Sequence, residues 1–411
     1  MGGRGRRPVR LRLFPDKNQA TTPAGANRWP RRAVIAVFFV QGFLFASWTA
    51  HIPRLQHHLS LSDGRLGFAL LGAPVGSVLA IGVAGRLLPM VGSKPMVRVS
   101  LVGYCVLGPF IGLTDSLVTF FVAFLLWGFF QGTLDVSMNT QAITVERCSG
   151  RVLMPGFHGS WSTGALVGAL TGAVAVGLGL SLSEQLLALA LPCLLVGGWL
   201  TTALLPDQRT DSDLEPSKST GGWRSGVLQS AVLVLGAIAF ADMLCEGAAA
   251  DWSAVYLRNS LHAVPLVAGL GYAAYSLAML GIRLFGNRIF TRFAAHRVLS
   301  LLAAIASLGF AAGLIIARPV SVLIGFALLG AGLGSVVPII LRSAGAVNNV
   351  ETGRAVAAVA GFGWVGFVVG PVVIGEFASL TTLRTALFLI PVLAGAVAVA
   401  TGKAKVLRLS T

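Results

Sequence analysis

Long apolar runs alternate with short charged or Gly/Pro-rich breaks along most of the chain. A helix of about 20 apolar residues spans the hydrocarbon core of a bilayer. The pattern therefore predicts twelve membrane-spanning helices, at residues 33–52, 64–84, 97–114, 118–145, 154–178, 184–204, 226–250, 265–285, 297–317, 320–343, 354–376 and 383–402.

One polar stretch, which holds four acidic residues with several Ser and Thr, divides these runs six and six. The fold class predicted is an all-α membrane protein of two related six-helix bundles. The expected organisation is a disordered basic cytoplasmic tail at 1–32, a first bundle at 33–205, a cytoplasmic linker at 206–225, a second bundle at 226–402 and a cytoplasmic tail at 403–411.

An internal repeat supports the division. Trp48 and Arg54 after the first run match Trp252 and Arg258 after the seventh, at an offset of 204 residues. Further matches at 202 to 204 residues fall in the second and eighth, fourth and tenth, and fifth and eleventh runs, and they include Leu66 with Leu270, Gly128 with Gly330, Gly132 with Gly334, Trp161 with Trp364 and Gly172 with Gly375. Because six spans are an even number, both copies insert in the same orientation and are related by an axis along the membrane normal.

Composition agrees with a membrane protein. Charged residues make up 11% of the chain and the mean hydropathy is +0.80, whereas soluble domains carry about 25% charged residues. The net charge of +16 does not indicate nucleic-acid binding, because the basic residues lie in a tail and in short loops instead of a folded patch. With the N-terminus inside, 26 of the 31 Lys and Arg fall on the cytoplasmic side, which predicts that both termini are cytoplasmic.

Several kinds of site have no signature in the chain. The four cysteines stand singly, which favours neither disulfides nor a metal site. No GxxxxGK[ST] or HExxH motif occurs, so we expect neither ATP hydrolysis nor a membrane hydrolase. The prediction is a protein that is not an enzyme, has no cofactor or metal, and draws energy from an ion or solute gradient.

Acids inside a bilayer are costly and are therefore candidate functional residues. Gln131, Asp135 and Asn139 recur at four-residue spacing, which places them on one helix face. We expect this face to line a water-filled cavity, and the alternative is a buried hydrogen-bond network between helices. His158 has a comparable estimated depth. It is a candidate proton partner for Asp135, or else a packing histidine.

In the second half, Asp242 and Glu246 lie one helical turn apart and could share a proton, because two charged acids repel. Aromatic side chains offer flat faces with polar handles for a solute. Near helix ends, however, Trp and Tyr more often anchor a helix at the membrane interface, an objection that applies most to Trp48 and Trp252. The substrate-binding candidates are Gln41, Gln131, Asn139, Trp161, Tyr275 and Trp364.

A family resemblance follows from the repeat and from local strings. The loop from Gly85 to Lys94 is similar to the signature between helices two and three of the major facilitator superfamily, with Pro89 in place of its usual acid. The strings 48–54, 132–141 and 251–258 resemble the bacterial branch near fucose-permease-like transporters. That group has an acid followed four residues later by Asn in its fourth helix, as Asp135 and Asn139 do here. No acid stands just before Pro53, where the group has one.

The resemblance implies a secondary transporter of a small polar solute such as a sugar. We expect proton-coupled symport by alternating access, in a monomer of the bacterial inner membrane. The expected partners are the solute, protons and the lipid bilayer, without nucleic acid. Two alternatives stay open: an exporter of drugs or amphipathic metabolites, and a membrane sensor that transports nothing.

Overall fold

The computed structural model describes residues 28–207, 229–347, 350, 352–404 and 407. Within these residues the chain is built from helices and forms no strand. Twelve segments of this part are long and apolar enough to cross a membrane. They are Trp29–His58, Asp63–Val91, Ser93–Ile111, Leu117–Ser149, Met154–Gly177, Leu182–Ala203, Ser230–Ser260, Pro265–Gly286, Ala295–Ile316, Pro319–Ala344, Gly353–Leu380 and Leu383–Lys403.

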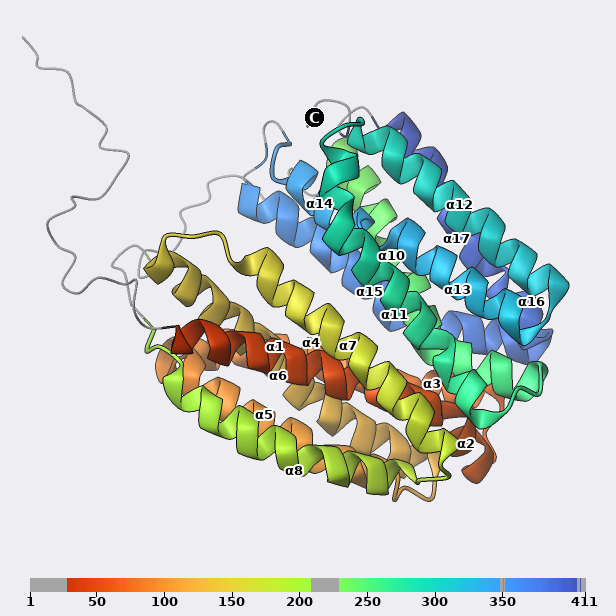
Figure 1. Ribbon diagram of the computed structural model, residues 1–411, viewed down its shortest axis with the longest axis horizontal. Helices are drawn as coiled ribbons and strands as arrows, with labels where there is room; N and C mark the ends of the chain where they lie inside the picture. The colour runs from red at the N-terminus through yellow and green to blue at the C-terminus, as the bar shows by residue number, and fades with distance from the viewer. Residues whose placement is uncertain (1–27, 208–228, 348–349, 351, 405–406, 408–411) are drawn as a thin grey trace, which may run out of the picture.

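Two bundles of six spans lie side by side (Figure 1). The first half consists of α1 (Trp29–Ser47), η2 (Thr49–His51), α2 (Ile52–His58), α3 (Asp63–Leu70), α4 (Gly72–Val91), α5 (Ser93–Ile111), α6 (Leu117–Ser149), α7 (Met154–Gly177), α8 (Leu182–Leu200) and η3 (Thr201–Ala203). The second consists of α10 (Ser230–Val255), η5 (Tyr256–Ser260), α11 (Pro265–Phe290), α12 (Ala295–Ile316), α13 (Pro319–Leu333), α14 (Val336–Ala344), α15 (Thr352–Leu380), α16 (Leu383–Leu387) and α17 (Leu389–Lys403).

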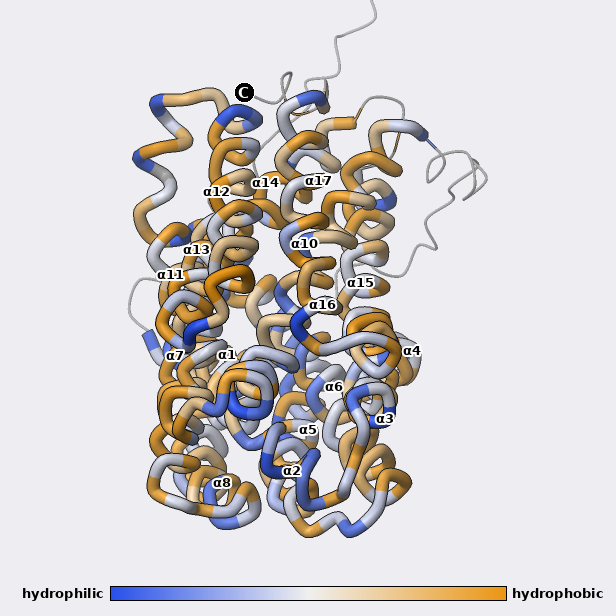
Figure 2. Tube along the Cα trace, turned by 90° about the vertical axis from the view of Figure 1, so that its right-hand side faces the viewer, coloured by the Kyte–Doolittle hydropathy of each residue, from blue (hydrophilic) through white to orange (hydrophobic). Residues whose placement is uncertain are grey.

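The predicted twelve-helix, six-plus-six fold is confirmed, with shifts at the ends of the spans. The first span begins at Trp29 instead of residue 33, and the seventh continues to Ser260 instead of ending at 250. Most of the predicted basic tail (1–27) and linker (208–225) lies outside the described residues. Apolar residues run along most of the helices in Figure 2, as a lipid-facing surface requires.

Two names are used below for the ends of the molecule. The terminal end is the one at which α1 and α10 begin and α8 and α17 finish. The distal end is the opposite one, where α3 and α11 begin. Each span connects the two, so the position of a residue along its helix gives its depth, at about 1.5 Å per residue.

The repeated Trp and Arg pair supports the fold at the distal end. Arg54 Nη1 donates to the carbonyl oxygens of Gly179 and Leu180, at 3.1 and 2.9 Å, and so holds the connection between α7 and α8. Arg258 Nη1 donates to the carbonyl of Ala263 at 2.8 Å. Backbone carbonyls in such connections between spans need donors, above all where water is scarce.

The two tryptophans of the repeat do not anchor the helices in the membrane interface. The side chains of Trp48 and Trp252 are 2% and 0% exposed, so both pack inside the protein. Trp48 contacts Phe124 and Trp127 edge to face, with ring centroids 4.7 and 6.3 Å apart. The interfacial alternative is therefore wrong for this pair.

Glycines bring helix pairs into close contact within each half. A Cβ at Gly164, Gly168 or Gly172 of α7 would overlap backbone carbonyls of α1, and a Cβ at Gly366 of α15 would overlap the carbonyl of Phe240 in α10. Small residues at such crossings let helix backbones pack tightly. Such packing matters inside a bilayer because the hydrophobic effect does not drive helices together there. Backbone-to-backbone packing therefore joins α1 to α7 in the first half and α10 to α15 in the second.

The two halves are joined most tightly at the distal end. A Cβ at Gly375 of α15 would lie 2.6 Å from the carbonyl oxygen of Asp63 and 3.1 Å from Gly67 Cα, both in α3. Asn259 Nδ2 in η5 donates to Gln56 Oε1 in α2 at 2.9 Å. Gln56 Nε2 donates in turn to Asp63 Oδ1 at 2.7 Å. We call this set of contacts, between α2–α3 and η5–α15, the distal seal.

The terminal parts of the same helices are not packed in this way. Ideal Cβ atoms placed at Gly82 and Gly85 of α4, or at Gly353 and Gly361 of α15, would meet nothing within 4 Å. These four glycines, in the terminal parts of α4 and α15, thus make no close contact of the kind that joins α3 to α15 at the distal end. This is the arrangement of a protein whose central cavity is closed on the distal side.

Candidate functional site

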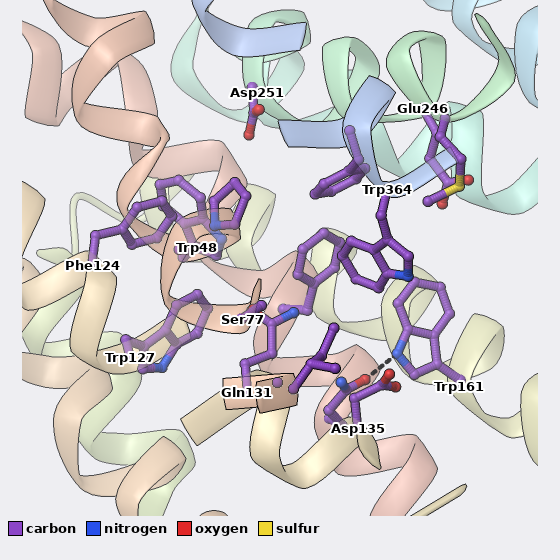
Figure 3. A pocket seen from close by; sticks show the side chains of 18 of the residues that line it. Trp48, Ser77, Phe124, Trp127, Gln131, Asp135, Trp161, Glu246, Asp251 and Trp364 are labelled. Carbon is purple, nitrogen blue, oxygen red and sulfur yellow. Dashed lines mark hydrogen bonds between the residues drawn. The ribbon is translucent and has the colours of Figure 1, made fainter. Parts of the chain in front are cut away.

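A cavity lies between the two halves and is lined by α1, α4, α6 and α7 from the first half and by α10, α11 and α15 from the second, together with Leu70 of α3. Its aromatic walls come from Phe45, Trp48, Phe124, Trp127, Trp161, Trp364 and Phe367. Its polar and charged lining comes from Gln41, Ser77, Gln131, Asp135, His158, Glu246, Asp251 and Arg283. Figure 3 shows the acids at opposite sides, with Asp251 and Glu246 above and Asp135 below.

Asp135 lies near the middle of α6, about 27 Å from the first residue of that helix. Asn139 is one turn further on. Its amide nitrogen donates to Asp135 Oδ1 at 3.3 Å and to the Asp135 carbonyl oxygen at 2.8 Å. Gln131 and Asp135 both line the cavity, whereas Asn139 is not among the lining residues. The polar stripe thus has two members facing the cavity and one that holds the carboxylate.

His158 lines the same cavity from α7. Its ring packs edge to face on Phe38, with centroids 5.3 Å apart. Among the described residues no hydrogen bond joins His158 to Asp135. The two groups expected to act as a pair therefore share a cavity without direct contact.

An aromatic bridge connects the two halves across the cavity. Trp161 of α7 and Phe367 of α15 both lie against Phe45 of α1, with ring centroids 5.9 and 6.4 Å apart. Trp364 packs on Phe367 at 5.9 Å. Trp161 Nε1 donates to Gln41 Oε1 (Figure 3). Gln41, Trp161 and Trp364, all predicted from the sequence, are thus brought together at the cavity.

Two other sequence candidates lie elsewhere. The side chain of Asp242 is 4% exposed and is not part of the cavity lining. Tyr275 is 1% exposed and stacks on Tyr272, with centroids 5.8 Å apart, inside the second half. Glu246, one turn from Asp242, does reach the cavity. The structure therefore places only one member of the acidic pair at the cavity and does not place Tyr275 there.

Sequence reasoning did not select Arg283, because the charge count assigned it to a loop. It lies within α11 and lines the cavity. Its Nη1 donates to Ser162 Oγ of α7 and its Nε to the Gly334 carbonyl beside the break between α13 and α14, both at 2.9 Å. An arginine inside a predicted apolar run (265–285) was the signal that could have identified it.

Among the described residues, no three His, Cys, Asp or Glu side chains gather as metal ligands.

No family model matches the chain. An uncharacterised MFS-type transporter of Yersinia pestis is 32% identical over 85% of this chain and 89% of its own length. The chain belongs to the major facilitator superfamily. The uncharacterised transporter y4wD of Sinorhizobium fredii is 31% identical over 90% of this chain and 97% of its own. The membrane protein MosC of Rhizobium meliloti is 33% identical over 88% and 86%.

Solved structures share the fold of the superfamily. A mutant of the nucleoside transporter NupG matches with a TM-score of 0.72 at 11% identity, over 90% of this chain and 98% of the other. A bacterial homologue of the human lysosomal transporter Spinster, in an inward-facing and unoccupied conformation, matches with a TM-score of 0.64 at 15% identity, over 94% and 98%.

The superfamily signature loop has an unexpected acid beside it. Pro89 replaces the usual acid of the loop and lies inside α4. The backbone N–H and the hydroxyl of Ser93, the first residue of α5, both donate to the Asp207 carboxylate. Lys94 Nζ donates to the carbonyls of Thr202 and Leu204, at 2.9 and 2.7 Å. The segment after the sixth span thus supplies a carboxylate to the start of α5, a position where the helix dipole favours an anion.

Proposed function

We propose that this protein is a secondary transporter that carries a small polar solute by alternating access and couples the movement to protons. The observation that carries the proposal is a cavity between the two halves that combines carboxylates with aromatic walls and is closed at one end only. A seal at one end is what a rocking-bundle transporter has in one of its two states.

Proton coupling rests on the cost of burying charge. Asp135 lies in the middle of a membrane span, so an ionised carboxylate is expensive there once the cavity closes. Binding a proton removes that cost and leaves a neutral group that can pass through an occluded state. Asn139 donates to this carboxylate and so favours a fixed orientation of it. Glu246 and His158 are further groups at the cavity that can carry the proton. Asp242 lies one helical turn before Glu246 on α10, outside the cavity lining.

The solute would bind among Gln41, Gln131, Trp161 and Trp364. These side chains offer amides for hydroxyl groups and flat faces for a ring. Trp161 is held by Gln41, so its indole is already oriented. Asn139 does not contact the solute in this proposal and instead orients the Asp135 carboxylate. Tyr275 has no part in the proposed binding site because it is buried away from the cavity.

We further propose that the chain works as a monomer in a bacterial inner membrane with both termini in the cytoplasm. The terminal end is then the cytoplasmic end, as the distribution of Lys and Arg favours. The arrangement described above would be inward-facing. Solute and proton would move in the same direction if they bind together.

Transport by the purified full chain in proteoliposomes tests the proposal. With an imposed pH gradient, uptake of a panel of sugars and small hydroxylated amines is measured together with proton movement by a pH-sensitive dye. Asp135→Asn should abolish proton movement driven by the solute and still permit solute binding. Asp115→Asn, which changes an exposed acid beside the first residue of α6, is the matched control. Proton-linked transport that survives in Asp135→Asn would refute the coupling role.

A second candidate function is export of amphipathic compounds. The seven aromatic residues of the cavity wall favour it. The same vesicles distinguish the two functions: an exporter would move an amphipathic cation and protons in opposite directions, whereas the proposed symporter moves solute and protons in the same direction.

A further inference from the structure

Asp251 is the one acid of the cavity that neither the sequence candidates nor the proposed coupling uses. It lies on α10 within the seventh span, is half-buried and faces the cavity. Figure 3 shows it on the side opposite Asp135, on the same side as the indole of Trp48. In the described part of the chain no hydrogen bond or ion pair reaches its carboxylate. A carboxylate inside a membrane span needs a partner that donates hydrogen bonds or carries a positive charge.

The charges of the cavity indicate which partner is missing. Three carboxylates and one guanidinium belong to its lining. Glu246 of α10 and Arg283 of α11 both belong to this lining and carry opposite charges, so they cancel in the net charge of the cavity. Asp135 has the amide of Asn139 as a donor and serves as the proton site. The charge that is left without compensation is that of Asp251.

We propose that Asp251 binds a cationic group of the transported solute, a protonated amine or a quaternary ammonium. This inference rests on the proposed function and names its substrate class. The aromatic walls of the cavity agree with it, because the faces of tryptophan and phenylalanine rings attract cations. The solute is then a small organic cation, with hydroxyl groups that the amides of Gln41 and Gln131 can bind.

Loading of the cavity then becomes electrically balanced. A proton on Asp135 and a cation at Asp251 together bring the net charge of the lining to zero, since the charges of Glu246 and Arg283 cancel in that sum. A neutral cavity can close on both sides without burying a net charge in a medium of low dielectric constant. With only one of the two ligands bound, one charge stays unpaired and closing is opposed. This condition is what couples the two ligands to each other.

The repeat shows that Asp251 is not required by the scaffold. At the offset of 204 residues that relates Trp48 to Trp252, the counterpart of Asp251 is Ser47. Ser47 is fully buried, and its hydroxyl donates to the Leu44 carbonyl at 3.1 Å. The same structural position therefore accepts a small neutral side chain in the first half. Asp251 also lies directly before Trp252, whose ring is close enough to Gly375 of the distal seal that a Cβ added there would lie 3.3 Å from it. A ligand at Asp251 would therefore lie near the contacts that must open.

Binding of isosteric probes to the purified full chain tests the inference. Choline and 3,3-dimethyl-1-butanol have the same shape, but only choline carries a charge. Glucosamine and glucose form a second pair. By isothermal titration calorimetry the cationic member of at least one pair should bind more than about tenfold tighter than the neutral member. Asp251→Asn should remove that preference, Asp251→Glu should keep it, and Asp115→Asn should leave binding unchanged.

Other outcomes overturn the inference. Equal affinity within both pairs, binding of none of the four probes, or a preference that survives in Asp251→Asn would each do so. If Asp251→Asn does not fold, the affinities of the cationic and neutral probes are still compared on the unaltered protein and on Asp251→Glu. That comparison decides whether the site prefers a cation. The proposed function fails separately: proton movement driven by a neutral sugar and lost in Asp135→Asn would uphold transport while refuting the cation site.

Discussion

The packing distances in the distal seal predict how far a single substitution shifts the equilibrium between the distally closed and distally open states. Gly375 of α15 packs against the backbone of α3, where a Cβ would lie 2.6 Å from the carbonyl oxygen of Asp63. Ordinary van der Waals contacts of a Cβ begin at 3.4 Å. Gly375→Ala therefore requires the two helices to separate by about 0.8 Å, the difference between these two distances. The neighbour is backbone and cannot rotate away.

Overpacking of this kind costs about 1–3 kcal/mol. The cost applies only to the state in which the seal is closed, because opening the distal end removes the contact. The equilibrium should therefore shift toward a distally open state by about 5- to 150-fold. Replacing Gly by Ala also favours the helix by about 1 kcal/mol, but α15 stays helical in both states and that gain cancels.

Labelling of a cysteine inside the cavity measures the shift. Ser77→Cys places a thiol on the lining, and Cys148→Ser removes the exposed native thiol. A membrane-impermeant maleimide is added on the distal side of oriented vesicles. Its reaction rate should rise with Gly375→Ala by the factor given above. Gly67→Ala, which meets Pro371 from the other side of the same contact, should act in the same direction.

Gly361→Ala is the matched control, because it lies on the same helix and a Cβ there would meet nothing within 4 Å. It should leave the labelling rate unchanged. If Gly375→Ala labels no faster than Gly361→Ala, the contact between α3 and α15 is not the gate, and the reasoning from the glycine packing is wrong.

Two further predictions concern stability in detergent. Asp207→Ala removes the acceptor of both donors of Ser93 and should lower the free energy of unfolding by about 1–3 kcal/mol, seen as a lower melting temperature, whereas Asp115→Ala should have little effect. Gly168→Val drives a branched side chain into the Phe43 backbone of α1 and should destabilise the first half by at least about 1–3 kcal/mol. A melting temperature equal to that of the unaltered chain would contradict either one.

The spans could be predicted from the sequence because hydropathy reports directly on the bilayer. Their ends were less accurate, and one such error affected the site. The seventh run was expected to stop at residue 250, which put Asp251 just outside it. The helix continues through Ala250 to Val255 and then into η5. It can do so because the residues after Asp251 are buried against the rest of the protein instead of facing water.

The candidate site was predicted in part, for a related reason. Helical spacing identifies residues that share a face, and it correctly put Gln131 and Asp135 together at the cavity. Spacing along one helix does not tell which face meets the other half. Tyr275 and Asp242 therefore looked as suitable as Glu246 until packing showed both of them inside the second bundle. Arg283 was missed because counting charges by loop ignores the possibility that a charge lies within a helix.

The duplication separates residues that hold the fold from residues that give it chemistry. Matched across the repeat are Trp48 with Trp252, Arg54 with Arg258, and Trp161 with Trp364. These residues pack inside the protein, hold the connections between helices or form aromatic walls. None of the titratable residues that line the cavity has such a match. At the offsets of the repeat, the residue that corresponds to Asp135 is Val337, and the one that corresponds to His158 is Gly361. In the same way, Glu246 corresponds to Gly42 and Arg283 to Leu79.

Such an asymmetry has a physical reason. Two copies of one carboxylate, facing each other across the axis between the halves, would repel whenever both were charged. Asp135 in the first half and Asp251 in the second can instead each bind a different ligand, the proton at Asp135 and the solute's cation at Asp251. Moving the charge of Asp251 to the symmetric position, by Ser47→Asp with Asp251→Ser, should therefore abolish coupling and lower the melting temperature, because Ser47 is fully buried, does not line the cavity and would hold an unpaired charge. Proton-linked transport retained in that exchanged variant would show that the side on which the charge lies is irrelevant.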